Sequence, residues 1–189
     1  IYGESKAIGE KMIKKYLKKK FIIIRPTSIW GPSDGSNYES FFSQISKKKY
    51  FHIRGFNPKI TFGYIGNFCF QLLELMKNED CYGSFYYLGD YKETELKSWA
   101  DSIYNEFHGS QTEINIIPYL LIKILACFGD LLNKIGFKFP INSYRLKNLT
   151  NDRIYDMDRT KKIIGKNLPF NLNKATKITV DWFIKTKTK

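Results

Sequence analysis

A tyrosine and a lysine four residues apart, Tyr2 and Lys6, begin a Lys-rich stretch that has the pattern of a helix. Positions i and i+4 lie on one helix face, so the phenol and the ammonium would point into the same space. A nearby positive charge favours the phenolate and lowers the pKa of the phenol from about 10 toward neutrality. The pair could then act as a general acid/base. An aromatic core residue beside a solvated Lys has the same spacing, and both interpretations stay open here.

The next segment is a short apolar run, Phe21-Ile22-Ile23-Ile24, which predicts a buried parallel strand over residues 21–25. A loop rich in Pro, Gly and Ser follows over residues 26–37. Open α/β folds bind ligands in the loops at the carboxyl ends of parallel strands. The loop is therefore a candidate site on physical grounds.

The strand runs into Arg25-Pro26-Thr27-Ser28-Ile29-Trp30-Gly31-Pro32. This order of motifs resembles the extended short-chain dehydrogenase/reductase family, also called the NAD-dependent epimerase/dehydratase family. Its members carry Tyr-x-x-x-Lys on a helix, then a strand, and then Arg-Pro-x-x-x-(Tyr/Trp)-Gly-Pro. Two motifs in register are more specific than either one. The resemblance continues, more weakly, to the end of the chain.

The resemblance implies roles for several residues. Tyr2 would exchange a proton with a substrate hydroxyl or carbonyl while hydride moves to or from NAD or NADP. Lys6 would hold the cofactor ribose and lower the pKa of Tyr2, and Pro26 would line the nicotinamide side. Ser28 stands where many sugar-nucleotide members have a substrate-binding Asn. The family's catalytic Ser or Thr lies upstream of its Tyr, outside this sequence.

Basic residues further along resemble the family's diphosphate contacts. Arg145 matches an Arg of the C-terminal lobe that reaches the substrate diphosphate, and an Arg on a solvated helix face is the competing interpretation. Near residue 60 the family often has another Arg, and here Lys59 or Arg54 would replace it. Asn67 stands where the family has Asp, but it also fits as the N-cap of a helix.

The resemblance implies an α/β fold that comprises the C-terminal part of a Rossmann-like doubly wound parallel sheet and a smaller α/β substrate-binding lobe. Residues 1–36 would end the NAD(P)-binding domain, and residues 37–189 would be mainly the substrate lobe, with short segments returning to the sheet. The sequence lacks the Gly-x-x-Gly-x-x-Gly turn that binds pyrophosphate. We therefore expect the C-terminal half of a longer enzyme, inactive and a poor NAD binder by itself.

Periodicity and turn residues predict the remaining elements. Thr94 would cap the helix that begins at Glu95, and the strands at 50–55 and 59–65 would flank a Gly-Phe-Asn-Pro turn. The other predicted helices cover residues 2–18, 38–48, 68–77, 118–135, 158–164 and 171–186, and the other predicted strands cover residues 83–89 and 113–117.

Residues 118–135 are the most apolar part of the chain, but Lys123 and Asp130 interrupt the run, which is also shorter than a membrane span. We expect a helix of the lobe, or an apolar patch that faces a partner or a lipid-like substrate.

A formal net charge of +13 raises the possibility of nucleic-acid binding. The Lys residues are spread over predicted helices without a nucleic-acid module among them, so solvated helix faces are the simpler interpretation. Three Cys without Cys-x-x-Cys spacing and two His predict neither a disulfide framework nor a metal site, and they suit the cytoplasm.

Together these features predict an NAD(P)-dependent epimerase/dehydratase of a nucleotide sugar that forms a homodimer when full length. One alternative is a reductase or dehydrogenase of a sterol-like substrate. Another is a non-catalytic scaffold that retains the fold.

Overall fold

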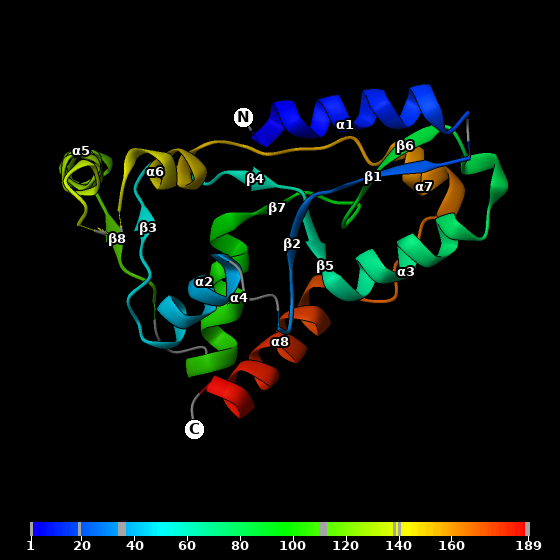
Figure 1. Ribbon diagram of the computed structural model, residues 1–189. Coiled ribbons are helices and arrows are strands. Elements are labelled where there is room, and N and C mark those ends of the chain that lie inside the picture. Colours follow the sequence, from blue (N-terminus) through cyan, green and yellow to red (C-terminus); the bar gives the residue numbers. More distant parts are fainter. Residues whose placement is uncertain are drawn as a thin grey trace.

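The computed structural model describes residues 2–18, 20–33, 37–109, 113–137, 139 and 141–187 (Figure 1). Its elements, in chain order, are α1 (Tyr2–Tyr16), β1 (Ile22–Pro26), β2 (Ser28–Trp30), α2 (Asn37–Ser46), β3 (His52–Ile53), β4 (Lys59–Ile60), β5 (Phe62–Tyr64), α3 (Ile65–Met76), the 3-10 helix η1 (Glu79–Cys81), β6 (Ser84–Leu88), β7 (Thr94–Glu95), α4 (Leu96–His108), β8 (Ile116–Ile117), α5 (Tyr119–Lys134), α6 (Ser143–Thr150), α7 (Asp158–Ile164) and α8 (Leu172–Lys187).

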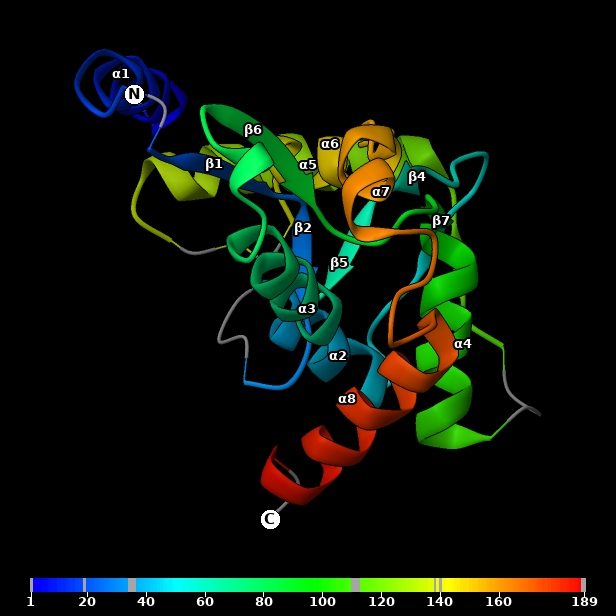
Figure 2. The ribbon, with the colours of Figure 1, turned by 90° about the vertical axis from the view of Figure 1, so that its right-hand side faces the viewer.

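The strands pair mainly in parallel. β1 pairs with β6, β2 with β5 and β3 with β8, whereas β4 and β7 are antiparallel. Parallel neighbours require a crossover connection, and α3 supplies part of the one between β1 and β6. Helices α3 and α7 pack against β6, as Figure 2 shows. These features confirm the predicted α/β fold class.

The main core is aromatic and is centred on Trp30, which is fully buried. Its ring lies 4.9 Å from Trp99 of α4 and 5.2 Å from Tyr64 at the end of β5, measured between ring centroids. Edge and tilted contacts of this kind stabilise aromatic pairs beyond the burial of area. The Trp of the Trp-Gly-Pro motif is therefore a core residue that joins β2 to α4.

The helices agree with the sequence-based prediction better than the strands do. The predicted loop at 26–37 contains a strand, β2, because Ser28–Trp30 find a parallel partner in Phe62–Tyr64. The strands predicted around the Gly55–Pro58 turn form no hairpin with each other: β3 pairs with β8, and β4 with β7. Local pattern identifies an extended segment but not its distant partner.

Thr94 was predicted to cap α4, and this is wrong. Thr94 lies in β7 opposite Ile60, and the N-cap position of α4 is Glu95, whose side chain makes no capping bond. The turn at residues 57–58 supplies the acceptors instead. The Asn57 side chain accepts from the Lys97 N–H at 3.0 Å, and the Pro58 carbonyl accepts from the Leu96 N–H at 2.9 Å.

Helix α1 makes no close approach at Gly9 within the part of the chain that the structure describes, because a Cβ at Gly9 would have no described atom within 4 Å. None of the described helices is long and apolar enough to cross a membrane.

Gly31 combines a positive φ with a crowded position. Its φ is +148°, and a Cβ there would lie 2.5 Å from the Ile65 Cγ2 atom. We predict that Gly31→Ala lowers the free energy of unfolding by about 2 kcal/mol, because strain and overpacking add. Gly9→Ala is the control and should raise stability by about 0.5–1 kcal/mol. Urea denaturation of both variants measures this, and equal effects would contradict the argument.

Candidate active site

Helix α1 carries Tyr2 and Lys6 and stands out from the rest of the molecule in Figure 2. Lys6 is exposed. The backbone of Tyr2 is helical, but its side chain lies outside the described part of the structure. The predicted meeting of the phenol and the ammonium therefore stays a prediction that rests on their helical spacing.

An ion pair between Glu10 and Arg25 fastens α1 to β1. The Arg25 Nε and Nη2 atoms donate to the two carboxylate oxygens of Glu10 at 2.9 and 2.7 Å. Glu10 follows Lys6 by four residues, so it continues the helical stripe of Tyr2 and Lys6. The Arg of the Arg-Pro motif thus holds the helix that bears the candidate acid/base.

Two aromatic residues of β6 complete the surroundings of Arg25. Its guanidinium carbon lies 4.2 Å from the Phe85 ring centroid, and its Nη1 atom is 3.5 Å from the Tyr87 hydroxyl. The bond from Arg25 lowers the pKa of Glu10, while the bonds to Glu10 and Tyr87 raise the pKa of Arg25. Both groups therefore stay charged, and planar stacking suits Arg better than Lys.

Pro26 and Ser28 occupy the carboxyl end of β1 and the start of β2. Pro26 is exposed and lies opposite Leu88, while Ser28 is partly buried opposite Phe62. Between them, the Thr27 N–H donates to the Leu88 carbonyl at 3.0 Å. The structure thus places both predicted residues at the edge where β1 and β6 end, which is where open α/β folds bind ligands.

A pair of amide side chains on α3 clamps the chain as it leaves β6. Gln71 donates to the Gly89 carbonyl at 2.8 Å and accepts from the Gly89 N–H at 2.9 Å. One turn earlier, Asn67 donates to Asp90 at 2.7 Å and exchanges two bonds with the backbone of Phe170. Asn67 is buried inside α3, which begins at Ile65, so its predicted N-cap role is wrong.

The basic residues predicted to contact a diphosphate lie on different elements. Lys59 is exposed on β4, and Arg145 is exposed on α6. A third cation, Arg153, was not predicted from the sequence. It bridges to Ile60 beside Lys59, and its Nε atom is buried without a hydrogen-bond partner among the described residues. No helical or motif pattern marks this extended segment, so only the tertiary pairing reveals it.

A cavity of about 770 Å³ lies elsewhere, between α2, α4 and α8, where Ser43, His108 and Phe183 are among its lining residues. Figures 1 and 2 place these helices on the opposite side of the strands from α1. Within the described ranges, no group of three or more His, Cys, Asp or Glu side chains is arranged to hold a metal ion. The candidate site is therefore defined by α1 and the ends of β1 and β6.

The Glu10–Arg25 pair gives a prediction about stability and pH. Its side chains are 22% and 35% exposed, so Glu10→Gln should lower the free energy of unfolding at pH 7 by only about 1 kcal/mol. Because the pKa of Glu10 lies below its usual 4.5, this contribution is present above pH 4.5 and disappears as the pH falls through the lowered value. Urea denaturation at several pH values, with Glu106→Gln as control, measures it. If the difference in unfolding free energy between wild type and Glu10→Gln stays the same in acid, the ion pair is not its cause.

The buried clamp gives a second prediction. Asn67→Asp would place two carboxylates together in the core, beside Asp90, whose pKa burial already raises. We expect a loss of about 2–4 kcal/mol at pH 7. The loss should shrink as the pH falls, because a carboxyl group with a raised pKa is most favourable when protonated. Thermal denaturation measures it, and Asn67→Asp combined with Asp90→Asn should recover part of the stability. If the double variant recovers no stability, the loss comes from the hydrogen bonds to Phe170 and not from the paired carboxylates.

No family model matches the chain. An N-acetyl-alpha-D-glucosaminyl-diphospho-ditrans,octacis-undecaprenol 4-epimerase from Escherichia coli O157:H7 is 22% identical over 187 residues, which are 96% of this chain and 56% of that protein. The chain spans about half the length of the curated relatives it matches.

Solved structures of epimerases share the fold. UDP-glucose 4-epimerase from Thermotoga maritima, with UDP-glucose, matches with a TM-score of 0.66 and 15% identity over 98% of this chain and 53% of its own. UDP-glucuronic acid 4-epimerase from Bacillus cereus, in complex with NAD, matches with a TM-score of 0.63 and 14% identity over 97% and 52%. At these identities the likeness shows the fold. The resemblance seen in the motifs is thereby confirmed at the level of architecture: the chain has the fold of the C-terminal half of the extended short-chain dehydrogenase/reductase family.

Proposed function

We propose that the complete protein is a nicotinamide-dependent epimerase or dehydratase that acts on a sugar linked to a diphosphate, in the first instance a nucleotide sugar. The observation that carries this proposal is the bidentate Glu10–Arg25 pair, which ties the helix of Tyr2 and Lys6 to the strand leading into Pro26. This supports the proposal because the helix that carries the proposed acid/base pair is fastened to a strand whose carboxyl end is where open α/β folds bind ligands.

In this proposal Tyr2 takes the proton of a sugar hydroxyl while the carbon that bears the hydroxyl gives hydride to the nicotinamide. Tyr2 later returns the proton when the keto-sugar is reduced again. Lys6 lowers the pKa of Tyr2 and holds the ribose hydroxyls of NAD or NADP. When bound, the nicotinamide supplies a hydride acceptor and donor. The exposure of Lys6 and Pro26 and the open space beside Gly9 are compatible with a dinucleotide along α1.

The diphosphate needs cations at the other side of the substrate. Arg153, with its buried Nε atom, and its neighbour Lys59 are the candidates that the fold brings together, and Arg145 on α6 is a further one. Arg recognises phosphate oxygens with a planar fork of donors. Ser28 is assigned to the sugar side because it follows Pro26 at the same edge.

A second candidate is a sugar diphosphate carried by a polyprenol, as in the name of the Escherichia coli relative. The specific observation in its favour is the row of exposed apolar side chains along α5, which includes Leu120, Ile124 and Phe128. A polyprenyl chain would supply an apolar partner that a nucleotide lacks. The acid/base chemistry at Tyr2 would be the same.

The deciding experiment expresses the complete coding sequence and titrates the protein with NAD and NADP by calorimetry. Lys6→Ala should weaken dinucleotide binding about tenfold, because it removes a charged contact. Tyr2→Phe should bind normally and lose about 10²–10⁴-fold in kcat on nucleotide-sugar or polyprenyl diphosphate-sugar substrates. Lys11→Ala and Tyr16→Phe, on the same helix, are matched controls.

Two outcomes would overturn the proposal. If no dinucleotide binds, Tyr2 and Lys6 are remnants of the fold, and the scaffold interpretation takes over. If Tyr2→Phe turns over substrate at the normal rate, another group is the acid/base. A homodimer in solution, measured by light scattering, would agree with the predicted assembly but would not test the chemistry.

A further inference from the structure

Helix α5 exposes a continuous apolar face. Six apolar side chains, each at least half exposed, form what we term the outward face: Leu120, Leu121, Ile124, Phe128, Leu131 and Ile135. Their spacings of one, three and four residues put them on one side of the helix. Phe137, beyond the end of the helix, is also 67% exposed. Such contiguous exposure of large apolar groups marks an interaction site.

The opposite side of α5 is fixed by packing. Ile122, Ala126 and Gly129 are buried, and the first two pack in a small core with Ile53 and Leu146. A Cβ at Gly129 would collide with the Ile141 carbonyl oxygen. The helix therefore cannot turn its apolar residues inward without losing this core, and the outward face is a fixed property of the fold.

Basic residues border the outward face. Lys123 and Lys134 are exposed and eleven residues apart, so they lie on the same flank, three turns from each other. The neighbouring helix α6 adds exposed Arg145 and Lys147. The acidic residue of α5, Asp130, lies on the same flank, four residues before Lys134, and its carboxylate accepts from the Ser143 N–H of α6 at 3.2 Å. Four cations against this one carboxylate leave the border of the outward face positively charged.

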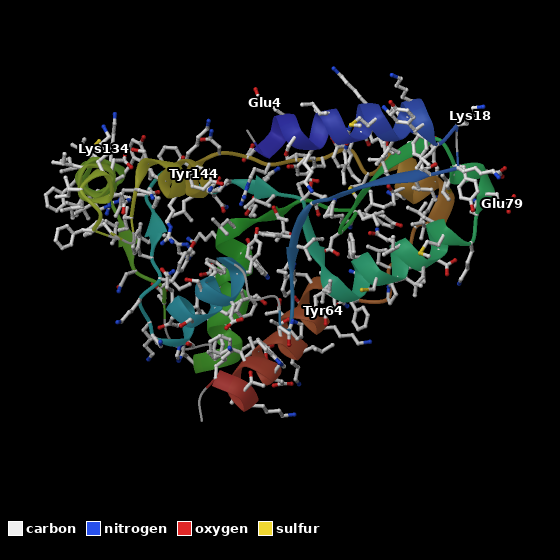
Figure 3. All side chains as sticks on the ribbon, viewed as in Figure 1. Glu4, Lys18, Tyr64, Glu79, Lys134 and Tyr144 are labelled. Carbon is white, nitrogen blue, oxygen red and sulfur yellow. The ribbon has the colours of Figure 1, made fainter. Side chains whose placement is uncertain are left out.

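The position of α5 suits contact with a broad surface. In Figure 1 this helix forms the edge of the molecule farthest from α3 and α7. Figure 3 shows side chains projecting from α5 away from the other elements, with Lys134 labelled on the helix and Tyr144 on α6. Tyr144 is 75% exposed, and an amphipathic ring of this kind favours the headgroup region of a bilayer.

We propose that the outward face of α5 docks on the surface of a bilayer that contains anionic lipids, with the helix lying in the plane of the interface. An apolar face with a Lys-bearing flank is the pattern of interfacial helices, and anionic headgroups complement the flank. A second copy of the chain fits less well, because two symmetric α5 helices would bring like-charged Lys rows together.

Vesicle sedimentation of the complete protein, without substrate or dinucleotide, tests this proposal separately from the reaction. The protein should sediment with vesicles of phosphatidylcholine and phosphatidylglycerol, and less with phosphatidylcholine alone. Ile124→Glu with Phe128→Glu should lower the partition coefficient at least about tenfold. Leu73→Glu with Met76→Glu changes charge and apolar surface equally on α3, and it should have little effect.

The charged flank is tested by Lys123→Gln with Lys134→Gln, which should weaken binding to anionic vesicles about fivefold per Lys and leave neutral vesicles nearly unaffected. Phe128→Trp provides a direct readout, since its fluorescence should be quenched by brominated lipids while that of Leu73→Trp is not.

Absence of sedimentation, or equal losses in the α3 and α5 variants, would overturn the proposal. A doubled mass by light scattering that Ile124→Glu with Phe128→Glu abolishes would instead identify a second copy as the occupant and would equally overturn it.

Discussion

The parallel pairing of β1 with β6 sets Pro26 opposite Leu88, and the candidate site depends on this register. The same pairing puts Phe85 and Tyr87 beside Arg25, which in turn holds Glu10 on α1. β1 and β6 are far apart in the sequence, and a group outside the two strands adds to their pairing. The amide of Gln71 does this by bonding both backbone groups of Gly89, directly after β6 ends.

The motif residues divide into packing and site roles in a way that the motif itself does not reveal. Trp30 fills the aromatic core, and Gly31 allows the chain to turn against Ile65. Arg25 positions α1, and Pro26 is left exposed at the strand end. The motif is therefore required by the fold as much as by the chemistry. The chemical inference rests on those motif residues that neither fill the core nor form a turn.

Local and distant interactions explain what the sequence could predict. The predicted helices were placed within a few residues, because periodicity and breakers act over one or two turns, whereas α6 was not predicted. The strand β2 and the roles of Asn67 and Arg153 were not foreseen, since each depends on a partner from a distant segment: Phe62–Tyr64, Asp90 with Phe170, and Ile60. Asn67 also fits an N-cap by propensity alone, so tertiary bonding decided its role. The position of Glu10 on the helix face of Lys6 could have been predicted, because the two residues are four apart.

The role of the many Lys residues also depends on their position in the fold. A surplus of Lys spread over helices is compatible with plain solvation, and composition cannot distinguish that from binding. On α5 the position of the Lys residues favours binding over plain solvation. Lys123 and Lys134 border an apolar face that cannot turn inward, because Gly129 packs closely against the chain. Since α5 lies far from α3 and α7 at the opposite edge of the molecule (Figure 1), substitutions on its outward face leave the β1–β6 register intact. Attachment to a surface and the chemistry on α1 are therefore physically separable properties of one fold.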